Sequence, residues 1–291
     1  ACVPKTVKAG TPMAKQVRVV HRFDEQGKAF FSQKMIEAEK IQPLGVAHSA
    51  QGFLPHRRRE AAVLSQLCTV FRMRRCNRSG LLLNTDESNA FGSGSRPKLS
   101  EQVPSLFLPE DRHFATQRLE WTAVELGAAD GILVLRNQVG VFMGDQMAVK
   151  EFLAMHEGPS NSWNAQHCYV QDGLDSLFLV ADSPITDEPG TATDLSFSKY
   201  ADDMVKGLIF SAGATLAHSF PVAEDSLSRL DATLGECGLA QNRDKMVAVM
   251  VLSGAQSRNT TRMTSKGQLV PPFSCKLATR SLGSIVSHNA S

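Results

Sequence analysis

Three aspartates stand where apolar segments of the chain end: Asp86 follows one apolar run, and Asp202 and Asp203 interrupt the apolar residues of 195–210. Carboxylate oxygens are the ligands that Mg²⁺ prefers. Two such ions about 4 Å apart can activate an attacking hydroxyl and neutralise a leaving pyrophosphate. These residue types therefore predict a divalent-metal site for phosphoryl transfer.

Each of the two acidic segments also has a plain structural interpretation. Asp86 could cap a following helix, and Asp202 with Asp203 could form an ordinary turn. For either segment alone, that interpretation is favoured. The two segments together, in this order and with further recognisable segments around them, favour the metal site.

The elements that must position these residues follow from apolar periodicity. Helical spacing predicts helices over 28–41, 60–71, 114–126, 148–155 and 226–237. Apolar runs predict strands over 17–20, 132–135, 177–180 and 246–252, with 132–135 buried, and a hairpin with an acidic tip over 195–210. Residues 92–112 and 182–194 are predicted as loops. Helices and strands without strict alternation indicate an α+β fold.

The bulk composition is that of a globular protein. The 291 residues, 42% apolar and 21% charged, suffice for one large domain or two subdomains. No run approaches the roughly 20 apolar residues of a membrane helix, so no membrane partner is expected. The six cysteines form no Cys-x-x-Cys pair and are expected as free thiols of an intracellular protein. The start at Ala1 and the absence of a basic-then-apolar leader indicate an internal fragment without a targeting signal.

Charge is distributed unevenly. Residues 1–80 carry 15 Lys and Arg against 5 Asp and Glu, and the remainder carries 16 against 24. The densest basic regions are Arg57–Arg59 and Arg72–Arg78. A polyanion-binding part beside a metal-binding part is one interpretation; a solvated surface of uneven charge is the other. Trp121 and Trp163 are expected in the core.

Several short segments resemble those of reverse transcriptases. Tyr200-Ala-Asp-Asp203 resembles their signature hairpin, and Asp86 with Ala90-Phe91 resembles their first palm motif. The other similar segments are Gln51-Gly-Phe-Leu-Pro-His-Arg57, Gly140-Val-Phe-Met-Gly-Asp145, Gly238-Leu-Ala-Gln-Asn242 with Lys245, and Leu282-Gly283. The segment at 51–57 is of the type found in retrotransposons without long terminal repeats, which are LINE-like elements.

This resemblance implies the fingers and palm of a right-hand polymerase. Fingers are expected over 1–80 and the palm over 81–286, the palm being an antiparallel sheet backed by helices. Residues 287–291 would begin a missing C-terminal region, because the resemblance implies a thumb and endonuclease regions of a larger polyprotein outside this sequence. The nucleus is the implied compartment if the element is eukaryotic.

The resemblance also implies an RNA-directed DNA polymerase that uses two Mg²⁺ ions, with Mn²⁺ as a substitute. Its partners would be an RNA template, a DNA primer and deoxynucleoside triphosphates. Asp86 and Asp202 would bind both metals with help from Asp203, and Lys245 would lie near the leaving pyrophosphate. The implied substrate-binding residues are Phe91, which would exclude a 2′-hydroxyl, and Gly144, Tyr200 and Arg57.

The chain departs from the family pattern in places. Met143 stands where the family usually has Gln, Ala148 where Ser often follows, and Lys206-Gly207 interrupts the apolar second arm of the hairpin. A strand with this interruption is expected to be weak. These departures leave an alternative function, a catalytically inactive nucleic-acid-binding remnant of a retroelement polymerase.

Overall fold

The computed structural model describes most of the chain, and only the described residues are considered below. They are residues 2–4, 17–19, 24–41, 50–54, 56–128, 131–142, 145, 147–165, 179–181, 191–193, 195–210, 216–253, 262–263, 266, 273–282 and 284–287. The chain divides into two compact units. The helical unit comprises Ala1–Val46, Asn89–Pro159 and Leu234–Leu239, and the sheet unit comprises Ala47–Ser88, Ser160–Thr233 and Ala240–Ser291.

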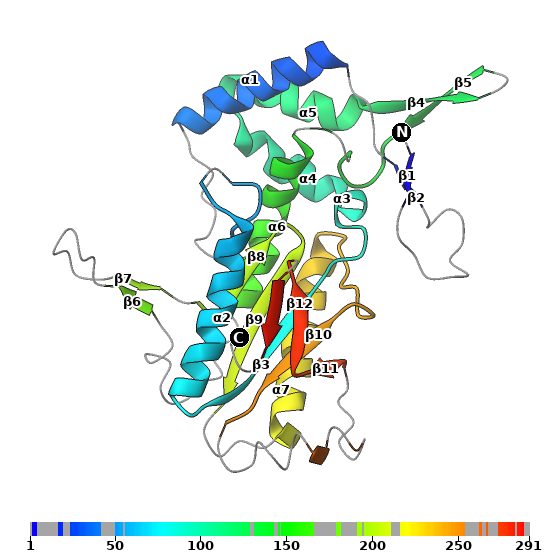
Figure 1. Ribbon diagram of the computed structural model, residues 1–291. Helices are drawn as coiled ribbons and strands as arrows, with labels where there is room; N and C mark the ends of the chain where they lie inside the picture. The colour runs from blue at the N-terminus through cyan, green and yellow to red at the C-terminus, as the bar shows by residue number, and fades with distance from the viewer. Residues whose placement is uncertain are drawn as a thin grey trace. The chain divides into compact units, whose positions relative to one another are not determined.

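A five-stranded sheet organises the sheet unit (Figure 1). Its order is β11 (Cys275–Lys276), β10 (Val247–Val251), β3 (Ser79–Thr85), β9 (Asp203–Phe210) and β8 (Phe197–Tyr200). All neighbours are antiparallel except β10 and β11. The central strand β3 is almost entirely buried, which is why its sequence is a continuous apolar run rather than an alternating one.

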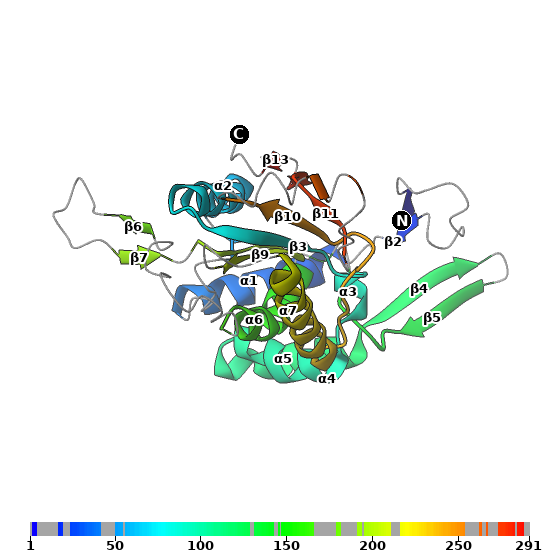
Figure 2. The same ribbon diagram turned by 90° about the horizontal axis from the view of Figure 1, so that it is seen from below.

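Helix α2 (Arg59–Arg75) covers one face of this sheet (Figure 2). Its residues Val70 and Met73 share a buried cluster with Leu82 of β3, two residues of β9 and two of β10. Val286, from the hairpin of β12 (Ala278–Ser281) and β13 (Ser284–Ser287), completes the cluster. The two residues of β9, Val205 and Ile209, are an even number of positions apart, as are Val249 and Val251 of β10, so each pair lies on one face of the pleated sheet.

The opposite face is covered by α7 (Leu216–Glu236) and by the end of α6 (Ala148–Ala165) (Figure 2). Trp163 is fully buried there, and its indole N–H donates to the carbonyl and hydroxyl oxygens of Ser226 at 2.9 and 3.0 Å. The Lys206 ammonium lies over the Trp163 ring and donates to the Trp163 carbonyl at 2.5 Å. A cation thus satisfies one of the last carbonyls of α6, where the helix dipole favours positive charge.

The strand β9 therefore runs without a break through Lys206 and Gly207. Lys206 contacts Trp163 on one side of the sheet. Gly207 faces α2 on the other side, where an added Cβ would lie 3.1 Å from the Thr69 methyl group. The expected weakness of this arm is not seen, because each of the two residues meets a matching surface on its own side of the sheet.

The helical unit contains α1 (Glu25–Ile41), α3 (Ala90–Ser93), α4 (Arg96–Gln102), the short 3-10 helices η2 (Val103–Leu106) and η3 (Pro109–Asp111), α5 (Arg112–Trp121) and the first part of α6. A hairpin of β4 (Ala123–Ala128) and β5 (Gly131–Arg136) follows α5 (Figure 1). Lys34 of α1 pairs with Asp111 of η3 at 3.3 Å, and Lys150 of α6 pairs with Glu39 of α1.

Three further antiparallel pairs are short. They are β1 (Cys2–Pro4) with β2 (Val17–Val19), β6 (Leu179–Ala181) with β7 (Thr191–Thr193), and the β12–β13 hairpin. Strands β2 and β6 agree with the runs predicted at 17–20 and 177–180. Among the described residues, no helix is long and apolar enough to span a membrane.

The prediction of a loop over 92–112 is wrong. Three prolines that favoured a loop each stand at the first or second position of a helix: Pro97 in α4, Pro104 in η2 and Pro109 in η3. Proline is well suited to these positions, because its missing N–H would be unsatisfied there in any case and its φ is already helical.

Three predictions about 114–135 also need correction. Helix α5 ends at Trp121, and the apolar residues that continued the helical pattern form β4 instead. Strand β5 exists where predicted but is exposed along its whole length, not buried. Trp121 is 67% exposed, whereas Trp163 lies in the core as expected. An apolar run predicts a strand or helix more reliably than it predicts what covers the element.

The two tryptophans provide a test of this packing. Trp163→Phe should lower the free energy of unfolding by about 2–3 kcal/mol, because it removes two hydrogen bonds and buried volume. Trp121→Phe, the matched control at an exposed position, should change it by less than about 0.5 kcal/mol. Chemical denaturation of both variants measures the difference, and equal losses would contradict the described burial.

Candidate active site at the ends of three strands

The sheet register brings the predicted aspartates to neighbouring strand ends. Thr85, the last residue of β3, pairs with Met204 of β9. Asp86 follows Thr85, and Asp203 precedes Met204, so the two aspartates lie at adjacent positions across the same strand ends. Asp202 occupies the tight turn between β8 and β9, where Tyr200 pairs with Asp203.

The third strand end belongs to the segment before β10. The Asp86 carbonyl accepts a hydrogen bond from Asn242 N–H at 2.7 Å, and Ser88 N–H donates to the Ala240 carbonyl at 2.8 Å. The turn that follows presents Lys245, whose ammonium lies 2.5 Å from the Asp86 carboxylate. Asp86 is 19% exposed and Lys245 is 66% exposed. Backbone contacts therefore hold Asp86 between the hairpin tip and the Lys245 turn.

The carboxylates at this edge of the sheet repel one another electrostatically. Burial is the main cause that raises the pKa of Asp203 to about 6, and the negative charges of Asp202, Asp86 and Glu87 raise it further, while Lys245 lowers it. Such a rise is expected where desolvation and like charges act on one carboxyl group. A divalent cation would relieve this repulsion.

Glu87 is a buried acid that the sequence reading did not single out. Its carboxyl is almost completely buried, and this desolvation raises its pKa to about 8; the charge of Lys199 opposes the rise and that of Asp86 adds to it. Lys199 is itself buried in β8 and donates to the Ser160 hydroxyl at 2.9 Å. Two features of the sequence could have pointed to this buried pair. Glu87 directly follows the strand-end Asp86, and Lys199 lies two residues after Phe197, on the same face of an apolar strand.

The loop at 50–57 packs against the hairpin that carries Asp202. Ala50 bridges to Lys199, and Gln51 N–H donates to the Lys199 carbonyl at 2.7 Å. A Cβ on Gly52 would lie 2.4 Å from the Ala201 backbone nitrogen. Only glycine permits this approach.

Two predicted substrate-binding residues lie in the same contact. The ring of Phe53 lies 6.1 Å, centroid to centroid, from that of Tyr200. The partly buried Arg57 guanidinium donates to the Ala50 carbonyl at 2.5 Å, and this hydrogen bond joins the two ends of the loop at 50–57. This contact positions Arg57 beside the hairpin, and its role towards a substrate stays a prediction.

The remaining two predicted substrate residues are placed differently. Phe91 lies in α3 of the helical unit and stacks on Phe152 of α6 with ring centroids 4.8 Å apart. Its expected position beside Asp86 is untested, because the two residues belong to different units. Gly144 and Met143 lie outside the described residues. The fingers and palm boundaries at residues 80 and 286 likewise stay predictions.

The aspartates match the donor chemistry of Mg²⁺, which takes carboxylate oxygens. Within the described part of the chain, no three His, Cys, Asp or Glu side chains stand in a geometry that could hold a metal ion. In this conformation the Lys245 ammonium supplies the positive charge beside Asp86. Ion binding would require that exposed side chain to turn away and the carboxylates to converge.

Comparison with known proteins gives a result of fold only. No protein-family model matches the sequence, and no curated protein matches it. Among solved structures, apo telomerase from Candida tropicalis aligns with a TM-score of 0.53 and 9% identity, over 90% of this chain and 39% of that one. Telomerase of the same organism in complex with the TWJ fragment of telomeric RNA aligns with a TM-score of 0.50 and 10% identity, over 78% and 35% of the two chains.

The likeness is one of fold. The chain spans between a third and two fifths of the telomerase chains that it matches. It shares a mixed α/β fold with these telomerase structures, and the aspartates stand at strand ends of its sheet. At 9–10% identity, the likeness does not assign an activity.

The loop–hairpin contact can be tested at Gly52. Gly52→Ala should destabilise the protein by about 1–3 kcal/mol, because the new methyl group collides with backbone that cannot yield without a shift. Gly235→Ala in α7, where no atom lies within 4 Å of an added Cβ, should stabilise it by about 0.5–1 kcal/mol. If thermal or chemical unfolding of Gly52→Ala matches that of the parent, the loop is not packed on the hairpin.

The pKa of Glu87 predicts a pH dependence of stability. Between pH about 4.5 and about 8, the folded carboxyl keeps a proton that the unfolded one loses. The parent should therefore lose stability relative to Glu87→Gln as pH rises through this window, by at most about 1.4 kcal/mol per pH unit. Denaturation at a series of pH values measures this difference.

The matched control is Glu60→Gln, because Glu60 is fully exposed and its pKa is lowered, chiefly by a hydrogen bond from its own backbone. Relative to Glu60→Gln, the parent should not lose stability as pH rises. A flat difference for Glu87→Gln would mean that Glu87 is ionised in the folded protein.

Proposed function

We propose that the chain is the core of an RNA-directed DNA polymerase, which adds deoxynucleotides to a primer 3′-end. The observation that carries the proposal is the placement of Asp86, Asp202, Asp203 and Lys245 at neighbouring strand ends of one sheet. The shared fold with telomerases, which are reverse-transcriptase-like polymerases, supports it.

Asp86 and Asp202 would hold two Mg²⁺ ions, or Mn²⁺ in their place, with Asp203 assisting. When bound, these ions would supply charge neutralisation for the attacking hydroxyl and the leaving pyrophosphate. The sheet register fixes Asp86 and Asp203 at opposed backbone positions, and Asp202 lies in the tight turn before Asp203. Rigid strand ends suit a reaction that depends on positioning.

The Lys245 side chain would have two positions. In the described conformation it pairs with Asp86 and partly neutralises the negative charge at this edge of the sheet. With substrate bound, its exposed side chain would be released towards the leaving pyrophosphate as a charge partner. A mobile ammonium is suited to this change, since its long stem stands 66% exposed.

The substrate contacts that we propose rest on the resemblance of the motifs. Phe91, stacked on Phe152, offers a fixed ring to exclude a ribose 2′-hydroxyl, and Gly144 would let the nucleotide approach the backbone. Tyr200 and Arg57 lie at the loop–hairpin contact of the sheet unit. We assign residues 1–80 to fingers and 81–286 to palm on the resemblance of their motifs.

An RNA template and a DNA primer would bind partly through charge. Helix α2 carries the exposed residues Arg59, Arg74 and Arg75, and Arg58 precedes it. Phosphates would be attracted to these cations with an affinity that falls as salt rises. The source would be a LINE-like retroelement, of which this chain is one part.

A second candidate function is a nucleic-acid-binding remnant without catalysis. The observation that favours it is the ion pair between Lys245 and Asp86, which places an ammonium group beside a proposed metal ligand. Both functions involve RNA binding, and only the polymerase carries out a chemical step. Measuring primer extension and RNA binding on the same protein therefore separates them.

Replacement of the metal ligands gives the decisive prediction. The parent should extend a DNA primer on an RNA template with deoxynucleotides and Mg²⁺, and Asp202→Asn should lose extension by at least about a hundredfold. Loss of metal-derived charge stabilisation, worth several kcal/mol, accounts for this factor. RNA affinity, measured by fluorescence anisotropy, should remain within a few fold, because the substitution removes negative charge and no phosphate partner.

Asp244→Asn is the matched control, since Asp244 is an exposed aspartate in the turn beside Lys245. It should extend primers like the parent. A parent that binds RNA but extends no primer with either Mg²⁺ or Mn²⁺ would identify the remnant instead.

A further inference from the structure

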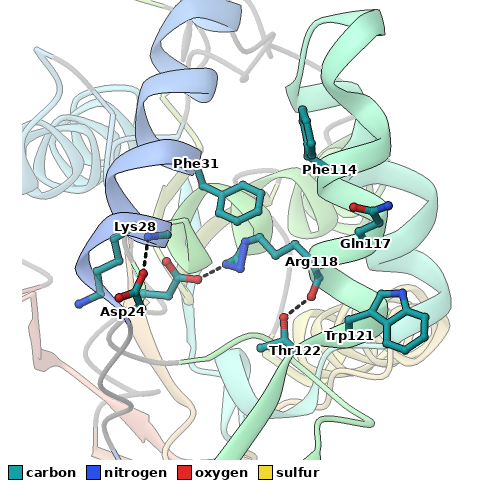
Figure 3. Close-up of a pocket in the computed structure, with 10 residues that line it drawn as sticks. Asp24, Lys28, Phe31, Phe114, Gln117, Arg118, Trp121 and Thr122 are labelled. Atoms are coloured by element: carbon teal, nitrogen blue, oxygen red, sulfur yellow. Dashed lines mark hydrogen bonds and ion pairs between the residues drawn. The ribbon is translucent and has the colours of Figure 1, made fainter.

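A pocket of about 350 Å³ lies wholly within the helical unit, between α1 and α5 (Figure 3). This volume falls at the lower end of the range for small-ligand sites. It shares no residue with the acidic strand ends. Its wall is formed mainly by the rings of Phe31, Phe114 and Trp121, with Arg118, Gln117 and Lys28 among the polar lining residues.

The rings are held in place before any ligand arrives. Phe30 packs edge-on against Phe31 at 5.3 Å and against Phe114 at 5.2 Å, centroid to centroid. The guanidinium of Arg136, from β5, lies over the Trp121 ring at 5.4 Å. Figure 3 shows Phe31 extending from α1 into the space that faces Phe114 and Trp121 of α5. Pre-formed aromatic faces reduce the entropy lost when a flat ligand binds.

Arg118 forms a buried polar part of the same wall. Its side chain is only 9% exposed, lies over the Phe31 ring, and is anchored through one nitrogen, Nη2, to Asp145 and to Glu151. Its buried Nε–H has no hydrogen-bond partner among the described residues. An unmet donor in a nearly buried cation is rare in native structures, so this N–H is a candidate donor to a bound ligand.

The carboxylates of the pocket are already engaged. Asp24 accepts from Gly27 N–H at 2.6 Å at the start of α1. Asp145 accepts from Arg118 and from Met147 N–H. The charged lining residues are two acids, Asp24 and Asp145, and two bases, Lys28 and Arg118, so they sum to zero. The wall therefore presents aromatic faces and hydrogen-bond donors without net negative charge, and this argues against a metal ion.

We propose that this pocket binds one nucleotide through its base. The base would stack on Trp121 and the phenylalanines, since every base has a π-face. An acceptor on its edge would meet the Arg118 Nε–H, and the Gln117 amide at the rim offers both a donor and an acceptor. Lys28 and Arg136 would attract the phosphate. The source is either a free nucleotide or a nucleotide of a single RNA strand, and the proposal holds whether or not the chain polymerises.

Intrinsic fluorescence tests the proposal directly. The chain has two tryptophans, of which Trp121 is 67% exposed and Trp163 is fully buried. The full chain carrying Asp202→Asn, in EDTA, is titrated with adenosine monophosphate, with a short single-stranded RNA and with ribose 5-phosphate. Base stacking should quench Trp121, so the first two should lower the emission and ribose 5-phosphate should not. Because neither metal nor catalysis is needed, failure of the polymerase proposal would leave this test intact.

Variants assign the signal to the pocket. Trp121→Phe should abolish the quenching while RNA binding, followed by anisotropy, persists. Trp121→Ala should weaken binding of the short RNA by about 5- to 150-fold, the range for loss of one base–aromatic stack. Leu133→Ala, which removes a 52% exposed side chain of β5 outside the pocket, should bind like the parent.

The outcomes separate the sources. Equal affinity for adenosine monophosphate and the RNA identifies a site for free nucleotides, and much tighter binding of the RNA identifies a strand-binding site; both support the proposal. The proposal is overturned if neither ligand quenches Trp121. It is equally overturned if Trp121→Ala binds both as tightly as Leu133→Ala does.

Discussion

The register of β3 against β9 and β10 is the constraint on which the rest of the site depends. It brings Asp86 next to Asp203 on one side and next to Lys245, 159 positions later in the chain, on the other. A slip of one residue would turn every side chain of a strand to the opposite face. Such a slip would take the apolar side chains of β9 away from α2 and turn Lys206 from Trp163 onto the apolar face that α2 covers. Packing of the two faces therefore also fixes the aspartates.

The same arrangement concentrates charge where burial is costly. Asp203 and Glu87 both have a raised pKa, for which burial is the main cause. The cations near them are of two kinds, the exposed Lys245 and the buried Lys199. Stability alone would favour apolar residues at such positions. A carboxylate cluster kept at this cost is characteristic of sites that bind cations or move protons, although structural networks also shift pKa values.

Much of this fold could be predicted from local patterns, and the exceptions have physical causes. The hairpin at 195–210, helix α2 and strand β10 followed from periodicity because each buries its apolar residues within one unit. The loop predicted at 92–112 failed, because proline starts helices as readily as it interrupts them. Strand β5 was found but its exposure was not, and the burial of Glu87 depends on distant partners that no local pattern contains.

If Asp86 and Asp202 share divalent ions, as proposed, the bound ions can be counted. Mn²⁺ binding to the full chain, with a primer–template and a non-hydrolysable nucleotide, can be measured by electron paramagnetic resonance. We expect two tightly bound ions in the parent and the loss of tight binding in both Asp86→Asn and Asp202→Asn, with Asp244→Asn unchanged. Tight Mn²⁺ binding that survives either substitution, or that is absent from the parent, would contradict this proposal.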